Sequence, residues 1–244
     1  MNEYEKRAMD ELIAWQKKIK KSSSLFGSLA KRVQTRINRI IPEKIHAAFT
    51  LAIKQMTRAV IFGSGFTTAQ PLVEGSLEER EIKVSQRIKF YKNTAATEGA
   101  ITGAGGILLG LADFPIWLTL KMKMLHEIAS LYGYDVKAYQ ERIFILHVFQ
   151  LTFSSQAHRK KILSTVESWD IEEVNLPNDM NKFDWRTFQL EYRDYIDLAK
   201  LLQLVPGIGA PIGAYVNHRL TKKLGVTAMN AYRLRWKQQK RITS

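Results

Sequence analysis

The sequence contains no cysteine among its 244 residues. This absence excludes disulfide bonds, thiolate nucleophiles, iron–sulfur clusters and zinc sites built from cysteine. Long apolar runs are also scarce, and the mean hydropathy of −0.20 is too low for a protein with many membrane spans. Hydrophobic residues make up 45% of the chain, as in an ordinary globular protein, so disorder of the whole chain is excluded as well.

Recognisable catalytic motifs are absent too. The chain has no phosphate-binding loop, and in the glycine-rich run 103–108 Leu108 stands where the dinucleotide fingerprint needs its last glycine. His126 and Glu127 resemble the start of a zinc-protease motif, but Ser130 replaces the second histidine ligand. We therefore favour a non-enzymatic protein with no catalytic residue, no cofactor and no bound metal.

Positive charge is abundant and lies at the two ends of the chain. The formal net charge is +14. Residues 1–45 hold eleven Lys/Arg and five Asp/Glu, whereas residues 198–244 hold nine Lys/Arg and no acidic residue. Basic ends of this kind attract anionic partners, and a membrane surface, a nucleic acid and an acidic protein are the candidates. The alternative is that the charges only form solvated helix faces. The candidate contacts with an anionic surface are Arg219, Lys222, Lys223, Arg233 and Arg235.

Apolar residues recur at helical spacing, and no alternating strand pattern or Asn-Gly hairpin signal occurs. The first such stripe consists of Tyr4, Ala8, Leu12, Trp15 and Ile19. These patterns predict an all-α fold of about eight to ten helices that includes glycine-rich helical hairpin segments.

Local signals predict where some helices begin and end. Residues 76–79 match a capping box, and Gly133 is placed to end a helix that begins near Asp113. Gly225 is predicted to separate two final helices, at about 211–224 and 227–241.

We expect a single domain over residues 1–244 with three distinct regions. These are basic amphipathic helices in residues 1–45, a glycine-rich central motif in residues 94–135 and basic helices in residues 198–244. An acidic loop over residues 170–184 is the best candidate for an internal boundary. The first residues lack the pattern of a secretory signal, so we expect a cytoplasmic location.

Glycine interrupts two apolar segments, residues 99–112 and 201–217. Glycines four residues apart share a helix face and let a neighbouring backbone approach closely. At 1.5 Å per residue the uncharged runs reach only about 21 and 25 Å, less than a hydrocarbon core of about 30 Å. These lengths are compatible with a hairpin that enters a membrane only partly and with a hairpin packed in the core of a soluble protein. The candidate membrane or packing glycines are Gly99, Gly103, Gly106, Gly110, Gly207, Gly209 and Gly213.

Two acidic residues border the first glycine segment, Glu98 and Asp113. Glu98 is a candidate buried carboxylate that binds a cation or a proton, with a helix-terminal carboxylate as the alternative. Asp113 precedes a predicted helix and suits the position of its N-cap. A hydrolase or peptidase that uses these two carboxylates is the alternative to a non-enzymatic protein.

The central motif resembles a known bacterial family. Residues 91–106, 110–115 and 131–135 closely resemble the EcsC protein family, and residues 206–213, Asn217 and 231–235 resemble its C-terminal signature. A weaker likeness links residues 112–133 to glycine-rich membrane-associated domains that accompany some bacterial GTPases. The resemblance to the EcsC family covers nearly the whole chain.

The resemblance implies a bacterial protein that is cytoplasmic or peripheral on the inner face of the cell membrane. The family takes its name from a gene beside an ABC-type exporter, so an accessory role to a membrane transporter is implied as well. The resemblance supplies no catalytic residues. Our leading hypothesis is therefore a non-enzymatic, membrane-associated helical protein whose partners are an anionic membrane surface and a transporter. Nucleic-acid binding through the C-terminal basic helix, beside Tyr232 and Trp236, is the less favoured alternative.

Overall fold

The computed structural model describes residues 1–21, 70–104, 114–154, 156–169 and 209–242. All regular structure in these residues is helical, which confirms the all-α prediction for this part of the chain. The helices are α1 (Glu3–Lys20), α4 (Leu77–Ala104), α6 (Phe114–Leu131), α7 (Tyr139–Phe153), α8 (Gln156–Glu167) and α11 (Gly209–Ile242).

The described part of the chain holds six helices, fewer than the eight to ten predicted. One reason is that α4 and α11 are long, at 28 and 34 residues, and run through glycines that were expected to interrupt helices. The predicted glycine-rich hairpins are not seen in the described residues, because residues 105–113 and 170–208 lie outside them. The proposed boundary at residues 170–184 lies outside them too.

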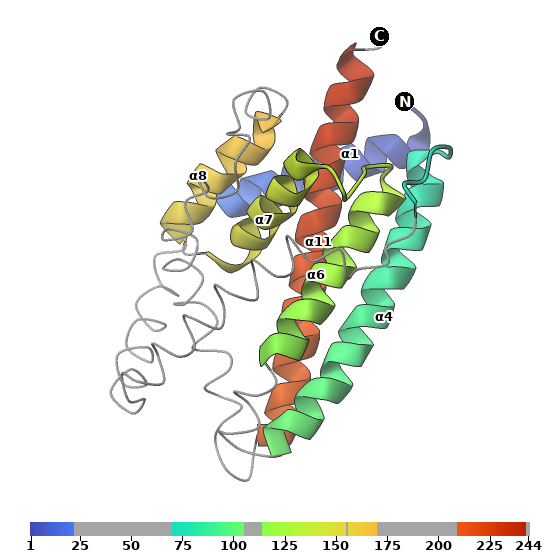
Figure 1. Ribbon diagram of the computed structural model, residues 1–244. Helices are drawn as coiled ribbons and strands as arrows, with labels where there is room; N and C mark the ends of the chain where they lie inside the picture. The colour runs from blue at the N-terminus through green and yellow to red at the C-terminus, as the bar shows by residue number, and fades with distance from the viewer. Residues whose placement is uncertain (22–69, 105–113, 155, 170–208, 243–244) are drawn as a thin grey trace.

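The long helix α11 is the centre of the fold. It packs most extensively against α4 and also contacts α1, α6, α7 and α8. Figure 1 shows α4, α6 and α11 running side by side, with α7 and α8 beside α11 and both chain termini near the same end. No helix in the described ranges is sufficiently long and apolar to span a membrane.

The core lies around α7. Eleven of its fifteen residues are buried, so this helix is apolar on nearly all sides, as expected for a helix enclosed by others. The stripe predicted for residues 4–19 faces this core as well, with Ala8 and Leu12 almost fully buried. The spacing of apolar residues therefore identified the packed face of α1 correctly.

The two local signals at helix ends are confirmed. Ser76 Oγ accepts a hydrogen bond from the backbone N–H of Glu79 at 3.3 Å, and the backbone N–H of Ser76 donates to Glu79 Oε2 at 2.8 Å. These reciprocal bonds form the capping box at the start of α4. Gly133 follows α6 with a φ of +96°, a conformation that favours glycine.

The break predicted at Gly225 is wrong, because α11 continues through this residue. A Cβ atom at Gly225 would lie 2.7 Å from Ile88 Cγ1 and 2.9 Å from Ile88 Cγ2. Gly225 therefore allows α4 to pack closely against α11. The same absence of a side chain that favours a helix end also permits a close helix crossing.

We expect Gly225→Ala to lower the free energy of unfolding by about 1–2 kcal/mol, because the strain of overpacking exceeds the gain in helix propensity. Urea unfolding measures this change. In the double variant with Ile88→Ala the obstructing side chain is absent, so adding the methyl group should then be neutral or stabilising. An equal loss in both backgrounds would show that Ile88 is not the obstacle.

Candidate functional site

Arg233 lies inside the protein, paired with Glu81. Its Nη2 and Nε atoms donate to Glu81 Oε2 and Oε1 at 2.6 and 2.7 Å, in the bidentate arrangement that suits a guanidinium and a carboxylate. The two side chains are 5% and 0% exposed. A further bond of 2.8 Å from Nη1 reaches Glu11 Oε2, so this arginine links α1, α4 and α11.

Two tyrosines complete the environment of Glu81. The hydroxyl groups of Tyr4 and Tyr132 donate to its two oxygens at 2.7 and 2.9 Å. Burial, followed by the bond to Glu81, raises the pKa of Tyr4 to about 12, and burial beside Glu81 raises the pKa of Tyr132 well above its ordinary value. Both hydroxyls therefore stay protonated and act as donors.

Arg235 is enclosed in a similar way. It pairs with Glu141, and its guanidinium carbon lies 3.7 Å from the ring centroid of Tyr134 and 4.6 Å from that of Phe144. The hydroxyl of Tyr232 donates to the same Glu141 carboxylate. Neither Arg233 nor Arg235 reaches a surface, so the structure places these two predicted surface contacts in the core. The sequence shows that both residues are charged, but it does not show that they pair with carboxylates far away in the chain.

Glu98 lies in the interior of α4 and not at a helix end. Asn217 Nδ2 donates to Glu98 Oε2 at 2.8 Å, and Trp117 Nε1 donates to Asn217 Oδ1 at 3.0 Å. Asn217 and Trp117 are both fully buried, and the Nζ atom of Lys121 lies 3.8 Å from the Trp117 ring centroid. This chain of bonds connects α4, α11 and α6. Asp113 lies outside the described residues, so its role as an N-cap and its joint use with Glu98 in an enzyme stay predictions.

The backbones of α4 and α11 touch at Gly99 and Gly213. A Cβ atom at Gly99 would lie 2.5 Å from the carbonyl oxygen of Gly213. Glycine is therefore required at residue 99 for this crossing. Gly103 lies in α4 and Gly209 begins α11. The surroundings of these two, together with residues 106, 110 and 207, are outside the described residues.

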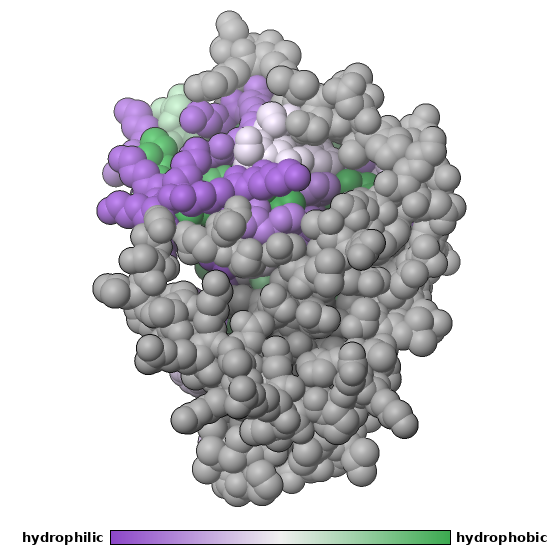
Figure 2. Space-filling model, turned by 90° about the vertical axis from the view of Figure 1, so that its left-hand side faces the viewer, coloured by the Kyte–Doolittle hydropathy of each residue, from purple (hydrophilic) through white to green (hydrophobic). Residues whose placement is uncertain are grey.

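The remaining predicted contacts, Arg219, Lys222 and Lys223, line a cleft of about 1440 Å³ between α1, α8 and α11. Figure 2 looks at the side of the molecule where α8 lies in Figure 1, and shows strongly hydrophilic residues gathered over its upper part with separate hydrophobic residues between them. No Asp or Glu is among the described residues that line the cleft. Its cations are Lys17, Lys18, Lys20, Lys21, Arg159, Arg219, Lys222 and Lys223, and its apolar residues include Trp15, Ile19, Leu151, Leu220 and Val226.

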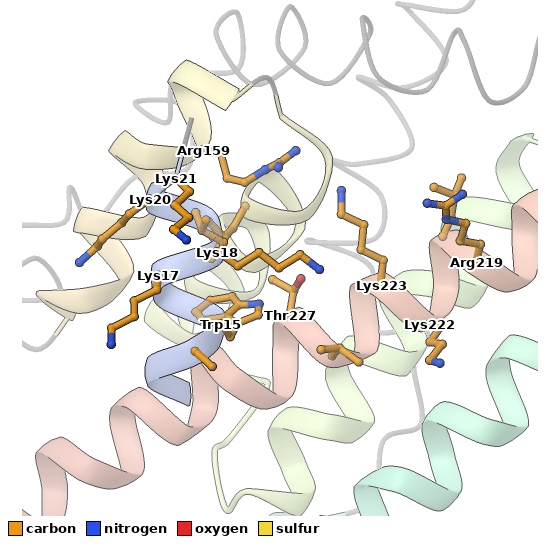
Figure 3. Close-up of a pocket in the computed structure, with 15 residues that line it drawn as sticks. Trp15, Lys17, Lys18, Lys20, Lys21, Arg159, Arg219, Lys222, Lys223 and Thr227 are labelled. Carbon is orange, nitrogen blue, oxygen red and sulfur yellow. The ribbon is translucent and has the colours of Figure 1, made fainter. Parts of the chain in front are cut away.

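The cations of the cleft do not all point the same way. Lys18, Arg159 and Lys223 reach toward the same space from α1, α8 and α11, whereas Lys17 and Lys20 point away from it (Figure 3). Lys20 is held by Glu167, with an Nζ to Oε1 distance of 2.8 Å. Three helices therefore contribute one cation each to the inner part of the cleft.

The end of α7 holds two of these three cations in place. Lys223 Nζ donates to the carbonyl oxygen of Thr152 at 2.6 Å, and Arg159 Nη2 donates to that of Ser154 at 2.8 Å. Carbonyls at a helix C-terminus carry partial negative charge and suit cations. Burial, and then the charges of Arg159, Arg219 and Lys18, still lower the pKa of Lys223 to about 7.

The sequence did not identify Lys18, Lys21 or Arg159 as site residues. The basic character of the chain ends was a partial signal, but it could not show that α8 brings a cation to the same cleft. Within the described ranges, no three His, Asp or Glu side chains are grouped to hold a metal ion.

The comparisons with known proteins agree with the resemblance noted in the sequence. Protein EcsC of Bacillus subtilis (strain 168) is 45% identical over 93% of this chain and 94% of its own length. The uncharacterized protein YdbA of the same organism is 36% identical over 60% of this chain and 54% of its own length. No solved structure matches the chain. The family model of the EcsC protein family matches residues 6–236, and the chain therefore belongs to this family.

Proposed function

We propose that this EcsC-family protein is a non-enzymatic peripheral membrane protein that binds anionic phospholipid through the cleft between α1, α8 and α11. The observation that carries the proposal is the lining of the cleft. Eight cations and several apolar side chains surround it, and none of the described lining residues is acidic.

This lining matches the two parts of an anionic lipid. Cations near an anionic leaflet contribute about 1 kcal/mol each to binding, and apolar side chains between them suit the glycerol and acyl parts of the lipid. Nucleic acid fits less well, because single strands bind where exposed aromatic rings stack on bases. Of the two aromatic residues expected to serve this purpose, Tyr232 is only 1% exposed and Trp236 is partly buried against the core.

A stripe along α11 extends the cleft to the exterior. Tyr215, Arg219, Lys222 and Val226 follow one another at steps of four, three and four residues, so they share one helix face. Tyr215 is 62% exposed, and both cations of the stripe are exposed as well. Tyrosine is favoured at membrane interfaces. This face of α11 therefore combines the cations and the exposed tyrosine that suit contact with a bilayer.

The proposal includes the inner face of the cell membrane as the location. The accessory role beside an ABC-type transporter, which the family resemblance implies, would require such a position and stays a prediction. Binding of the purified protein to vesicles tests the membrane association by itself, without a transporter.

Co-sedimentation with vesicles tests the proposal. We expect the protein to pellet with vesicles that contain phosphatidylglycerol and not with pure phosphatidylcholine, and binding to weaken as salt screens the charges. The double variant Arg219→Glu/Lys222→Glu should bind at least about tenfold more weakly, because two favourable charges of about 1 kcal/mol each are lost and reversed. A carbonate wash should release a peripheral protein from the pellet.

The matched control is Lys83→Glu/Lys89→Glu, on the exposed face of α4 outside the cleft. It changes the net charge by the same amount and should keep most of the binding. Equal losses in the two variants would mean that the net charge, and not the cleft, determines binding. Absence of binding to anionic vesicles at low salt would overturn the proposal.

A further inference from the structure

The inner part of the cleft holds converging cations that a flat membrane surface would not contact. Lys18, Arg159 and Lys223 point into it from three helices (Figure 3). Lys223 is only partly exposed. Among the described residues, the cations Lys18, Arg159 and Arg219 act on its amine, which donates a hydrogen bond to the carbonyl oxygen of Thr152. A flat anionic surface could not reach a recessed amine of this kind, whereas a single small anion could.

Like charges that converge in a partly buried space destabilise one another. Burial, and after it the neighbouring cations, lower the pKa of Lys223 to about 7, so repulsion contributes the second part of this shift. An anion placed between the three side chains would turn this repulsion into attraction. The arrangement is therefore complementary to a group that carries more than one negative charge.

We infer that the recess formed by Lys18, Arg159 and Lys223 binds a single phosphomonoester group, as found on a lipid headgroup that ends in phosphate or on a small soluble phosphate ester. A phosphomonoester has three terminal oxygens and is a dianion near neutral pH, since its second pKa is about 6. A phosphodiester has two terminal oxygens and one charge. Two ammonium groups and the planar fork of an arginine offer one cationic group for each of the three terminal oxygens, and three cations favour a dianion over a monoanion.

Binding at Lys223 has a consequence for protons. At about pH 8 the phosphate is already a dianion, while the lowered pKa of Lys223 leaves its amine mostly neutral. The bound dianion raises this pKa, so the complex takes up a proton from the solvent. Affinity should therefore decrease as the pH rises from about 7, by up to about tenfold per pH unit.

The inference rests on the proposed function for the choice of a lipid, and the test separates the two. Titration calorimetry would compare phosphatidic acid with phosphatidylglycerol in vesicles of equal surface charge, at about pH 8 in two buffers of different ionisation enthalpy. We expect phosphatidic acid to bind about tenfold more tightly or better, with uptake of up to one proton per site. A separate titration with soluble glycerol phosphate tests binding of a phosphomonoester in the absence of a bilayer.

Variants at two neighbouring residues provide the control. Lys223→Met should abolish the preference and the proton uptake and leave the free energy of unfolding unchanged or higher, because it removes a repelled, partly buried charge. Lys223→Arg should keep the preference without proton uptake, since arginine does not titrate in this range. The adjacent Lys222→Met, at an exposed position, should weaken binding to both lipids alike and should therefore keep the preference and the proton uptake.

Each outcome has a separate meaning. Equal affinity for the two lipids without proton uptake would overturn the phosphomonoester site and leave the proposed function intact. Binding of glycerol phosphate without binding of vesicles would support the site and overturn the membrane proposal. A preference that survives Lys223→Met would also overturn the site.

Discussion

Glu81→Gln is expected to lower the free energy of unfolding by about 3–5 kcal/mol, because it leaves the buried guanidinium of Arg233 without its bidentate carboxylate. The amide keeps one acceptor oxygen but turns an NH₂ donor toward groups that are themselves donors. These are Arg233, Tyr4 and Tyr132, which all donate to Glu81 in the native protein. Urea unfolding of the purified variant measures the loss.

Glu78→Gln is the matched control for this prediction. Glu78 is exposed on the same helix, three residues away, and its replacement should change the stability by no more than about 0.5 kcal/mol. Replacing both partners, as Glu81→Met/Arg233→Met, should cost less than either single change, since an apolar pair leaves no isolated charge. A loss below about 1 kcal/mol for Glu81→Gln would contradict the proposed strength of this buried pair.

The position of Glu81 in the sequence is itself a signal that its side chain is buried. Leu77, Glu81, Val84 and Ile88 are spaced by four, three and four residues, and all four are buried. A carboxylate within an apolar stripe needs a buried cationic partner or several donors. The pattern could therefore have identified Glu81 as a core residue. It could not have identified Arg233, which lies 152 residues further along the chain.

Helix faces and helix ends were predictable because both depend on neighbours in the sequence. The stripe of α1, the capping box at Ser76 and the end of α6 at Gly133 are all of this kind. The prediction at Gly225 was wrong because a glycine can mark either a helix end or a close helix crossing. Only the position of Ile88 in space shows that the second applies here.

The cleft was predictable only in part. The net charge of the chain ends indicated that the first and last helices are basic, and Lys222 and Lys223 do line the site. Arg159 comes from α8, whose sequence gave no reason to place it beside α1 and α11. Arg235 shows the opposite case, because a basic residue near the chain end is enclosed by Glu141 and aromatic rings. Packing of distant segments decides between these outcomes.

Gly99→Ala should be the more damaging of the two glycine substitutions, with a loss of about 3 kcal/mol in the free energy of unfolding. The added methyl group would lie 2.5 Å from the carbonyl oxygen of Gly213 and 2.6 Å from Asn217 Nδ2. A backbone carbonyl cannot rotate away as a side chain can, so α4 and α11 must separate. Separation would also weaken the bonds that Asn217 makes with Glu98 and Trp117.

The comparison with Gly225→Ala makes this prediction specific. Removal of Ile88 beyond Cβ should relieve the strain at residue 225, whereas Asn217→Ala should not relieve Gly99→Ala, since the Gly213 backbone remains in place. Asn93→Ala, at an exposed site on α4, controls for the change in helix propensity. If Gly99→Ala were more stable than the native protein by about 1 kcal/mol, as alanine is relative to glycine in an exposed helix, the two helix backbones would not be in contact.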